Sequence, residues 1–179
     1  MATAETAALS PRLLSTQPRA ALAVFLLAAF AIGAALYSQY VGGLQPCELC
    51  LLQRWPYYLG VPVALVALFA SLRAPATRRS LASRLLWLLA LIFLVSFWLG
   101  VFHAGVEWGL WPGPTACTGG YAAPASTDDF LKSLETTAVV RCDAAAIRIL
   151  GLSLAGWNAV ASLIIAGIAF IGARSSAPR

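Results

Sequence analysis

The stretch AALAVFLLAAFAIGAALYSQY, residues 20–40, decides the fold, because it carries no charged side chain over its whole length. A helix of about 20 apolar residues crosses a bilayer core of roughly 30 Å. Three further runs at about 55–72, 85–104 and 150–173 are similarly apolar, the first of them containing Pro56 and Pro62. Pro56 suits a first helical turn, and Pro62 predicts a kink or a local adjustment that neighbouring helices satisfy. The sequence therefore predicts an all-α membrane protein, a bundle of four transmembrane helices.

The composition excludes an ordinary soluble enzyme. Of the 179 residues, 60% are hydrophobic and 11% charged, and the mean hydropathy is +0.81. Soluble domains average roughly 45–50% apolar and 25% charged residues. The net charge is +5. It says little about a nucleic-acid partner until the basic residues have been assigned to one side of the membrane or the other. We expect a single membrane domain over 1–179 and no nucleic-acid partner.

Arginine and lysine are distributed unevenly between the segments that connect the four runs. Eight of them lie in the tails and in the 73–84 linker with one acid, whereas four lie in the loops at about 41–54 and 105–149 with six acids. The positive-inside rule then places both termini, including the 1–19 tail, in the cytoplasm and both loops outside. A cleavable signal peptide within residues 1–40 is the alternative, although its apolar run exceeds the usual 7–15 residues.

All four cysteines lie in the two outer loops, at Cys47, Cys50, Cys117 and Cys142. An oxidising compartment such as a bacterial periplasm permits disulfides there, so Cys47 with Cys50 and Cys117 with Cys142 are plausible pairs. A structural staple remains an alternative for the second pair. A bridge between Cys47 and Cys50 closes too small a loop to stabilise the fold much, and such a motif is more usually redox-active or metal-binding.

Cys50 is expected just before or within the first turn of the second helix. Unsatisfied N–H groups and the positive end of the helix dipole favour a thiolate at that position. Arg54 follows four residues later, where a permanent cation would lower the pKa of the thiol further or hold an anionic ligand. The alternative for Arg54 is an interfacial side chain that reaches to the lipid headgroups.

The run PCELCLLQR, residues 46–54, together with four spans, a later cysteine pair and LGLSLAGWN at residues 150–158, resembles the disulfide bond formation protein B (DsbB) family over about residues 18–172. The resemblance implies a thiol:quinone oxidoreductase of the bacterial inner membrane that sustains disulfide bond formation. Its two loops would be periplasmic, and its partner a periplasmic DsbA-like dithiol oxidase.

The resemblance also implies a role for each site residue. Cys117 and Cys142 would take electrons from the partner, and Cys47 and Cys50 would reoxidise that pair and pass the electrons to a membrane quinone, ubiquinone in preference to menaquinone. Cys50, Arg54 and His103 would form the quinone site. For His103 the alternative is an interfacial residue satisfied by backbone or water.

In the second loop, Ser126 and Asp129 have capping-box spacing, and Phe130, Leu131 and Leu134 share one face. A short helix on the membrane surface and an ordinary solvated loop helix are both compatible with this pattern. In the last span, glycines are expected at helix-packing positions, at Gly151, Gly156, Gly167 and Gly172.

Three other functions compete with the resemblance. A vitamin K epoxide reductase-like protein would have its loop pair before the CxxC motif, the reverse of the order here. A metal carrier would use four thiolates, but the loops hold no second closely spaced pair, so no metal site is expected. The third is a structural scaffold whose loops are cross-linked by disulfides. Redox cycling of Cys47 and Cys50 is expected of an oxidoreductase and not of such a scaffold.

Overall fold

The computed structural model describes residues 16–72, 76–114 and 140–175, and these form four long helices with a small hairpin. The long helices are α2 (Thr16–Tyr40), α4 (Trp55–Leu72), α5 (Ala76–Glu107) and α8 (Leu154–Arg174), and the short elements are α3 (Glu48–Leu52), β1 (Arg148–Ile149) and β2 (Leu152–Ser153). Four helical segments are long and apolar enough to cross a membrane, the second of them including α3. The predicted all-helical bundle of four spans is confirmed.

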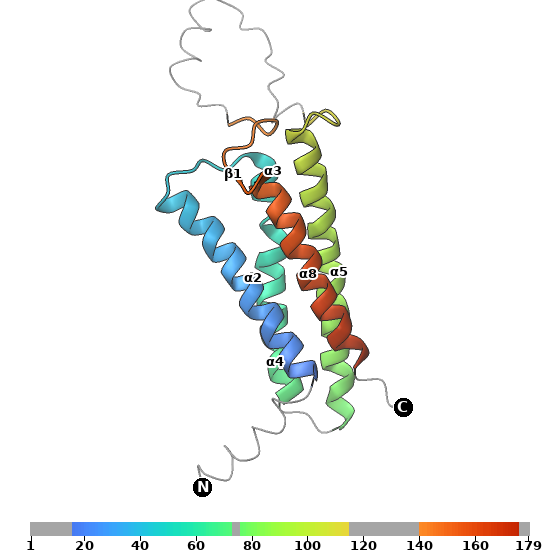
Figure 1. Cartoon of the computed structure of the whole chain (residues 1–179). Helices are drawn as coiled ribbons and strands as arrows, with labels where there is room; N and C mark the ends of the chain where they lie inside the picture. The colour runs from blue at the N-terminus through green and yellow to red at the C-terminus, as the bar shows by residue number, and fades with distance from the viewer. Residues whose placement is uncertain (1–15, 73–75, 115–139, 176–179) are drawn as a thin grey trace, which may run out of the picture.

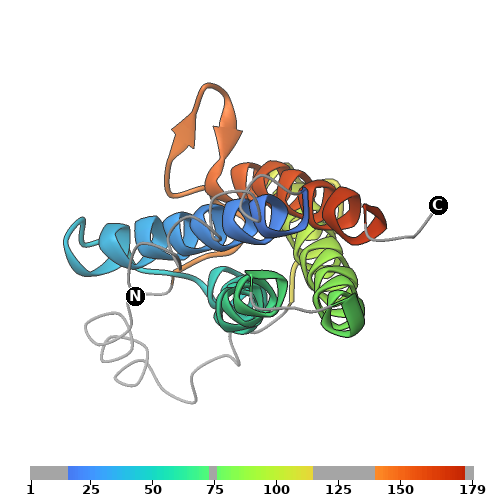
Figure 2. The ribbon, with the colours of Figure 1, turned by 90° about the horizontal axis from the view of Figure 1, so that it is seen from below.

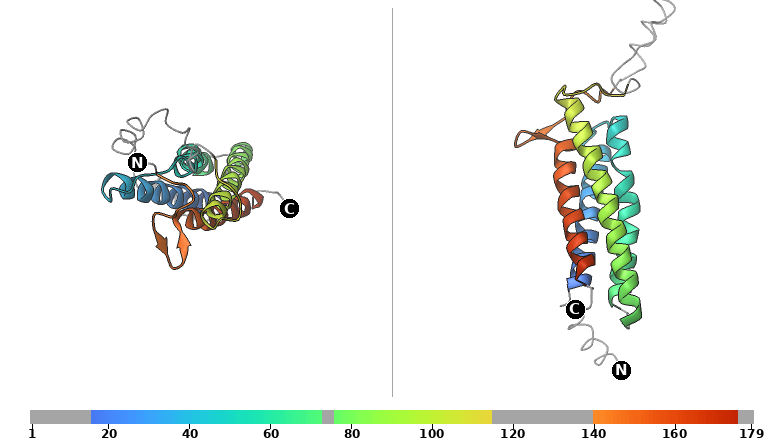
Figure 3. Two further views of the ribbon diagram at one scale, coloured as in Figure 1. Left: turned by 90° about the horizontal axis from the view of Figure 1, so that it is seen from above. Right: turned by 90° about the vertical axis from the view of Figure 1, so that its right-hand side faces the viewer.

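The four long helices surround one another in the order α2, α4, α5, α8. Contacts are most extensive between α5 and α8 and are sparse across the diagonal between α2 and α5. The start of α2 and the end of α8 lie at one end of the bundle, and α3 with the hairpin lies at the other (Figure 1; Figure 3). The CxxC motif therefore occupies the end of the bundle that is opposite the start of α2.

Small residues fill the interface between the helices, while large apolar side chains face outward. The buried core contains many alanines around Tyr57, Leu86, Leu89 and Phe93. Phe30, Leu91 and Trp98 are more than half exposed, which suits a lipid-facing surface. Helices in a bilayer associate through close packing of small residues, because lipid removes the hydrophobic driving force between them. The exposed apolar surface is consistent with a protein that is solvated by lipid.

The last helix begins four residues later than the sequence predicted. Residues 148–153 form an antiparallel hairpin whose turn places Leu150 at φ 52° and Gly151 at φ 85°. Ser153 then caps α8 by accepting a hydrogen bond from the Gly156 backbone N–H. An apolar run does not reveal such a turn, because Leu150 has the hydropathy of a span residue although it lies in the turn of the hairpin. Figure 2 shows the hairpin projecting beside α8.

The third span differs from the prediction at both ends. Its helix α5 includes much of the basic linker and continues to Glu107, beyond the expected limits of 85–104. It stops where Gly109 adopts a φ of 70°, and the Leu110 N–H returns to the Gly105 carbonyl. The helix α4 matches the expected 55–72 range and continues through Pro62.

The expected second-loop helix, residues 126–134, lies outside the described residues.

Of the four glycines predicted to pack against another helix in the last span, only one does so. A Cβ atom on Gly172 would lie 2.4 Å from the Ala20 Cβ atom on α2. Gly151 forms the hairpin turn, Gly156 faces its own chain, and a Cβ atom on Gly167 would meet nothing within 4 Å. A close approach between the backbones of two helices occurs instead at Gly100 on α5, where a Cβ atom would meet the Ala159 backbone nitrogen at 2.8 Å.

We predict that Gly100→Ala destabilises the bundle by about 1–3 kcal/mol, the usual cost of overpacking, because α5 and α8 must separate. Gly167→Ala is the matched control on α8, and it should be neutral or stabilise by up to about 1 kcal/mol through helix propensity. Thermal unfolding of both variants in the same detergent checks this. Equal melting temperatures for the two variants would contradict the proposed close contact.

Candidate functional site

The CxxC motif is held by the single turn of α3. Cys47 is the N-cap residue, and its Sγ accepts a hydrogen bond from the Cys50 backbone N–H at 3.2 Å. The two sulfur atoms lie 2.7 Å apart, and both cysteines are free thiols. The sequence predicted that donors at a helix N-terminus favour a thiolate at Cys50. In the structure the Cys50 N–H donates to the Cys47 sulfur atom instead, because α3 begins at Glu48, one residue after Cys47.

The surroundings of Cys47 favour its thiolate. The pKa of Cys47 is lowered to about 4, and a hydrogen bond from the Cys50 thiol is the largest cause. Hydrogen bonds from His103 and from the Cys50 backbone N–H act in the same direction, and burial opposes them. A thiolate is the reactive form of cysteine in disulfide exchange. Cys47 is therefore prepared for nucleophilic chemistry across the neutral pH range.

His103 lies beneath the CxxC motif, on α5, with its side chain almost fully buried. Its Nε2 atom is 3.6 Å from the Cys47 Sγ, and its Nδ1 atom is 2.6 Å from the Gln53 Nε2. An amide nitrogen can only donate, so Nδ1 accepts from Gln53 and the neutral ring carries its proton on Nε2. That N–H points at Cys47 and can stabilise its thiolate.

The hydrogen bond to His103 is the last of a chain that runs through three helices. Tyr57 donates to Asn158 at 2.6 Å, and Asn158 donates to the Gln53 Oε1 at 2.7 Å. The Tyr57 hydroxyl also contacts Ser162, which donates to Ser96. Each link presents a donor to the next acceptor, so the chain fixes the orientation of Gln53. The tautomer of His103 thus depends on α4 and α8.

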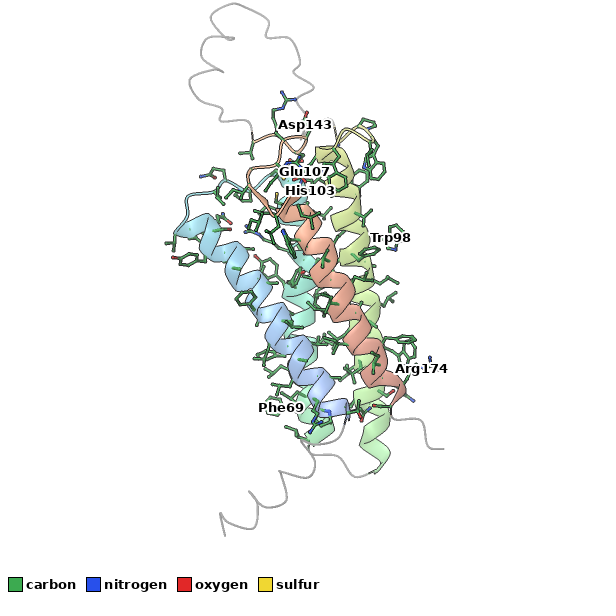
Figure 4. The ribbon with its side chains drawn as sticks, in the orientation of Figure 1. Phe69, Trp98, His103, Glu107, Asp143 and Arg174 are labelled. Carbon is green, nitrogen blue, oxygen red and sulfur yellow. The ribbon has the colours of Figure 1, made fainter. Side chains whose placement is uncertain are left out.

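Glu107 lies one turn beyond His103 on α5, and its side chain is nearly as buried. Its Oε1 atom is 3.8 Å from the His103 Nε2, and its side chain is 6% exposed. Among the described residues, Oε2 has no hydrogen-bond partner. Figure 4 shows both side chains close together at the end of the bundle, below the segment that carries Asp143. A buried carboxylate oxygen without a partner is costly, and such groups often mark a binding or catalytic role.

A cavity of about 470 Å³ opens beside the cysteine pair, where α2 leans away from the bundle (Figure 1). Apolar side chains of α2, α8 and the hairpin segment form most of its wall. The polar lining residues include Cys50, Gln53, Arg54, His103 and Asn158. Ligand sites are commonly apolar clefts of this size with a few convergent polar groups.

Arg54 is part of the cavity wall. Its guanidinium donates to the Gln39 Oε1 at 2.5 Å and to the Ala35 carbonyl at 3.3 Å, both on α2. These bonds connect the end of α2 to the start of α4. They leave the cation half-buried, beside Cys50 and the apolar wall.

Cys142 does not line the cavity and is fully buried. It packs in a small cluster with Cys47, Leu49 and Val106, and it is disulfide-bonded. A paired contact between Arg141 and Asp143 flanks it, and that contact lowers the pKa of Asp143. Cys117, the expected partner of Cys142, lies outside the described residues.

The structure thus brings together Cys47, Cys50, Arg54, His103 and Cys142, which the sequence had singled out from three separate regions. It adds Gln53, Tyr57, Glu107 and Asn158, for which no role was predicted. A pattern in the sequence could have found them, because polar residues recur four apart within apolar spans, as at Gln53 and Tyr57 or at His103 and Glu107. Polar residues inside spans are rare and tend to be functional.

We predict that the alkylation rate of Cys47 stays constant from pH 8 down to about pH 5 and falls only near pH 4, because thiolate is lost as pH drops through the pKa. Cys50→Ala removes the largest cause of the low pKa, so the midpoint should move to higher pH. Iodoacetamide labelling of a variant without the loop cysteines measures both. An unchanged midpoint in Cys50→Ala would contradict the assigned cause.

Comparison with known proteins gives a consistent family. The family described as "Disulfide bond formation protein DsbB" matches residues 17–172. "Disulfide bond formation protein B" of Marinobacter nauticus is 33% identical over 166 residues, which cover 87% of this chain and 92% of the relative. The protein of the same name from Cupriavidus metallidurans is 31% identical over 143 residues, covering 75% and 78%.

A shorter match has higher identity. "Disulfide bond formation protein B" of Methylococcus capsulatus is 47% identical over 53 residues, which cover 30% of each chain. No solved structure matches this chain significantly. The family, the four apolar helices and the adjacent cysteines together indicate an oxidoreductase of the inner membrane that acts in disulfide bond formation. The chain belongs to the DsbB family.

Proposed function

We propose that this protein oxidises a periplasmic DsbA-like dithiol oxidase by disulfide exchange and passes the electrons to a membrane quinone. One observation carries the proposal. Cys47 shares a buried cluster with Cys142, which is disulfide-bonded, whereas Cys50 lines an apolar cavity together with Arg54. An electron donor could therefore reach the pair through Cys47 and an electron acceptor through Cys50.

Electrons would come in through the second loop. A thiolate of the partner attacks the Cys117–Cys142 disulfide, and a second exchange releases the oxidised partner and leaves both loop cysteines reduced. The Cys142 thiolate then attacks Cys47 in the Cys47–Cys50 disulfide, and Cys50 leaves as thiolate. Cys117 resolves the Cys47–Cys142 bond. The loop disulfide reforms, and the electron pair now resides on Cys47 and Cys50. The packing of Cys142 against Cys47 supports this order.

Electrons would leave through the cavity, whose residues fit a quinone. Its apolar wall suits a ring with a prenyl tail, and Arg54, Gln53 and Asn158 offer donors to ring carbonyls. A bound quinone would supply a two-electron, two-proton acceptor, ubiquinone in preference to menaquinone. Cys50 faces the cavity and Cys47 lies behind it, so Cys50 is the residue that we assign to contact with the quinone. While Cys50 contacts the quinone, the His103 N–H would stabilise the Cys47 thiolate by a hydrogen bond.

Energetics favour such an acceptor. A DsbA-type partner is itself strongly oxidising, at about −120 mV, so a thiol pair alone cannot easily oxidise it. Removal of electrons into a lipid-soluble carrier drives the reaction forward. We further propose that both termini are cytoplasmic and that the CxxC end of the bundle faces the periplasm, as the uneven distribution of arginine and lysine indicates.

We predict that Cys47→Ser and Cys50→Ser each abolish quinone reduction by purified protein supplied with a reduced DsbA-like partner. Cys117→Ser should block electron transfer from the protein partner but retain turnover with a small dithiol, which can reduce Cys47–Cys50 directly. Loss of quinone absorbance follows both reactions. Full activity of all three variants with the protein partner would contradict the assignment.

We predict that Arg54→Met raises the KM for the quinone about 10–100-fold, the equivalent of one lost hydrogen bond to a charged group. The KM for the protein partner should stay the same, since the partner acts on the second loop. Arg174→Met is the matched control, because Arg174 lies at the far end of α8 over the Phe170 ring. A similar effect of both substitutions would argue against an Arg54 quinone contact.

A further inference from the structure

The reduced CxxC motif and His103 form a set of metal ligands. The Cys47 Sγ, the Cys50 Sγ and a His103 ring nitrogen all lie within 4.8 Å of one another. Two cysteines separated by two residues, with a histidine from elsewhere in the fold, are a common ligand set for Zn²⁺. The sequence predicted no metal site because the loops lack a second cysteine pair. The histidine on α5 supplies the third ligand instead.

The distances are close to those that a tetrahedral ion requires. Zn–S bonds of about 2.3 Å place two sulfur atoms about 3.8 Å apart in a tetrahedron. The sulfur atoms are 2.7 Å apart, and the Cys47 Sγ is 3.6 Å from the His103 Nε2. A side-chain rotation that separates the sulfur atoms by about 1 Å would therefore admit the ion. Cys50 and His103 line the cavity, which gives an ion access.

Glu107 is the second, independent observation. Its carboxylate is buried, lies 3.8 Å from the His103 Nε2, and has one oxygen without a partner among the described residues. A carboxylate can complete a tetrahedral Zn²⁺ site as the fourth ligand. A cation here would also compensate the negative charge that Glu107 and the two thiolates bring into a buried place.

The hydrogen-bond chain behind His103 can adapt to an ion. Binding through Nε2 moves the ring proton to Nδ1, which then needs an acceptor. Gln53, Asn158 and Tyr57 each carry both a donor and an acceptor, so rotation of the two amides reverses every link. Gln53 would then accept from Nδ1, the usual arrangement around a histidine that binds a metal.

We propose that the reduced Cys47–Cys50 pair, His103 and Glu107 bind a thiophilic divalent cation such as Zn²⁺. Binding releases the remaining thiol protons and transfers no electrons, so both sulfur atoms stay reduced. The bound ion would occupy the sulfur lone pairs that disulfide formation requires and would stop turnover. That last consequence rests on the proposed function, whereas the site itself does not.

The test uses Co²⁺ as a spectroscopic probe for Zn²⁺. Full-length protein in detergent is reduced with a phosphine, desalted without oxygen and titrated with Co²⁺. A variant with both Cys117→Ser and Cys142→Ser removes the competing loop thiols. We expect one Co²⁺ per chain in each protein, with thiolate charge-transfer absorption and tetrahedral d–d bands, displaced by Zn²⁺. Protein with an oxidised Cys47–Cys50 pair should bind none.

His103→Ala and Glu107→Gln should each weaken binding by about 10-fold or more, as changes to ligands and their supports do. Glu48→Gln is the matched control, because Glu48 is an exposed carboxylate next to Cys47. Circular dichroism and gel filtration verify that each variant is folded. Absence of binding in folded, reduced protein, or equal affinity in all three variants, would overturn the proposal.

Quinone reduction without added metal separates this proposal from the proposed function. Normal turnover in protein that binds no Co²⁺ would overturn the metal site alone. Binding with the expected dependence on His103 and Glu107, in protein that never reduces quinone, would support the site and overturn the proposed function. Inhibition of turnover by Zn²⁺, reversed by a chelator, would support both.

Discussion

The site depends on one constraint, which is that polar side chains within apolar helices must find hydrogen-bond partners inside the protein. Ser96, Ser162, Tyr57, Asn158 and Gln53 satisfy one another in a continuous chain that joins α4, α5 and α8. The chain ends on His103, whose other nitrogen faces Cys47. A bilayer offers no water to replace a broken link, so the chain holds the three helices together, and the orientation of its amides sets the histidine tautomer.

This arrangement gives the two cysteines different surroundings. Cys47 is buried and receives hydrogen bonds from Cys50 and His103, which favour its thiolate, and it belongs to the same buried cluster as Cys142. Cys50 faces the cavity beside Arg54. In the function that we propose, exchange with the second loop involves Cys47 and electron transfer to quinone involves Cys50. The same ligand set that favours a thiolate also suits a soft cation, which is the basis of the proposed metal site.

The sequence predicted much of this fold because membrane spans are determined by uninterrupted apolar length. It also singled out Cys47, Cys50 and Arg54 as candidate site residues, because they lie within one short motif. It missed the start of α8, since a turn at Leu150 and Gly151 within an apolar run leaves no signal in hydropathy. It missed the partners of His103 because Gln53 and Asn158 meet only after the helices pack. The cavity likewise arises from the inclination of α2, which depends on the whole bundle.

Photolabelling with an azido-quinone tests most directly whether the cavity beside Cys50 receives the electron acceptor. We expect label on cavity residues of α2, on the segment before α4 and on α8, such as Ala35, Gln53 and Trp157. Excess ubiquinone should suppress that label, and Arg54→Met should reduce it. Label confined to outward residues such as Phe30 and Trp98, with no competition by ubiquinone, would contradict a quinone site in this cavity.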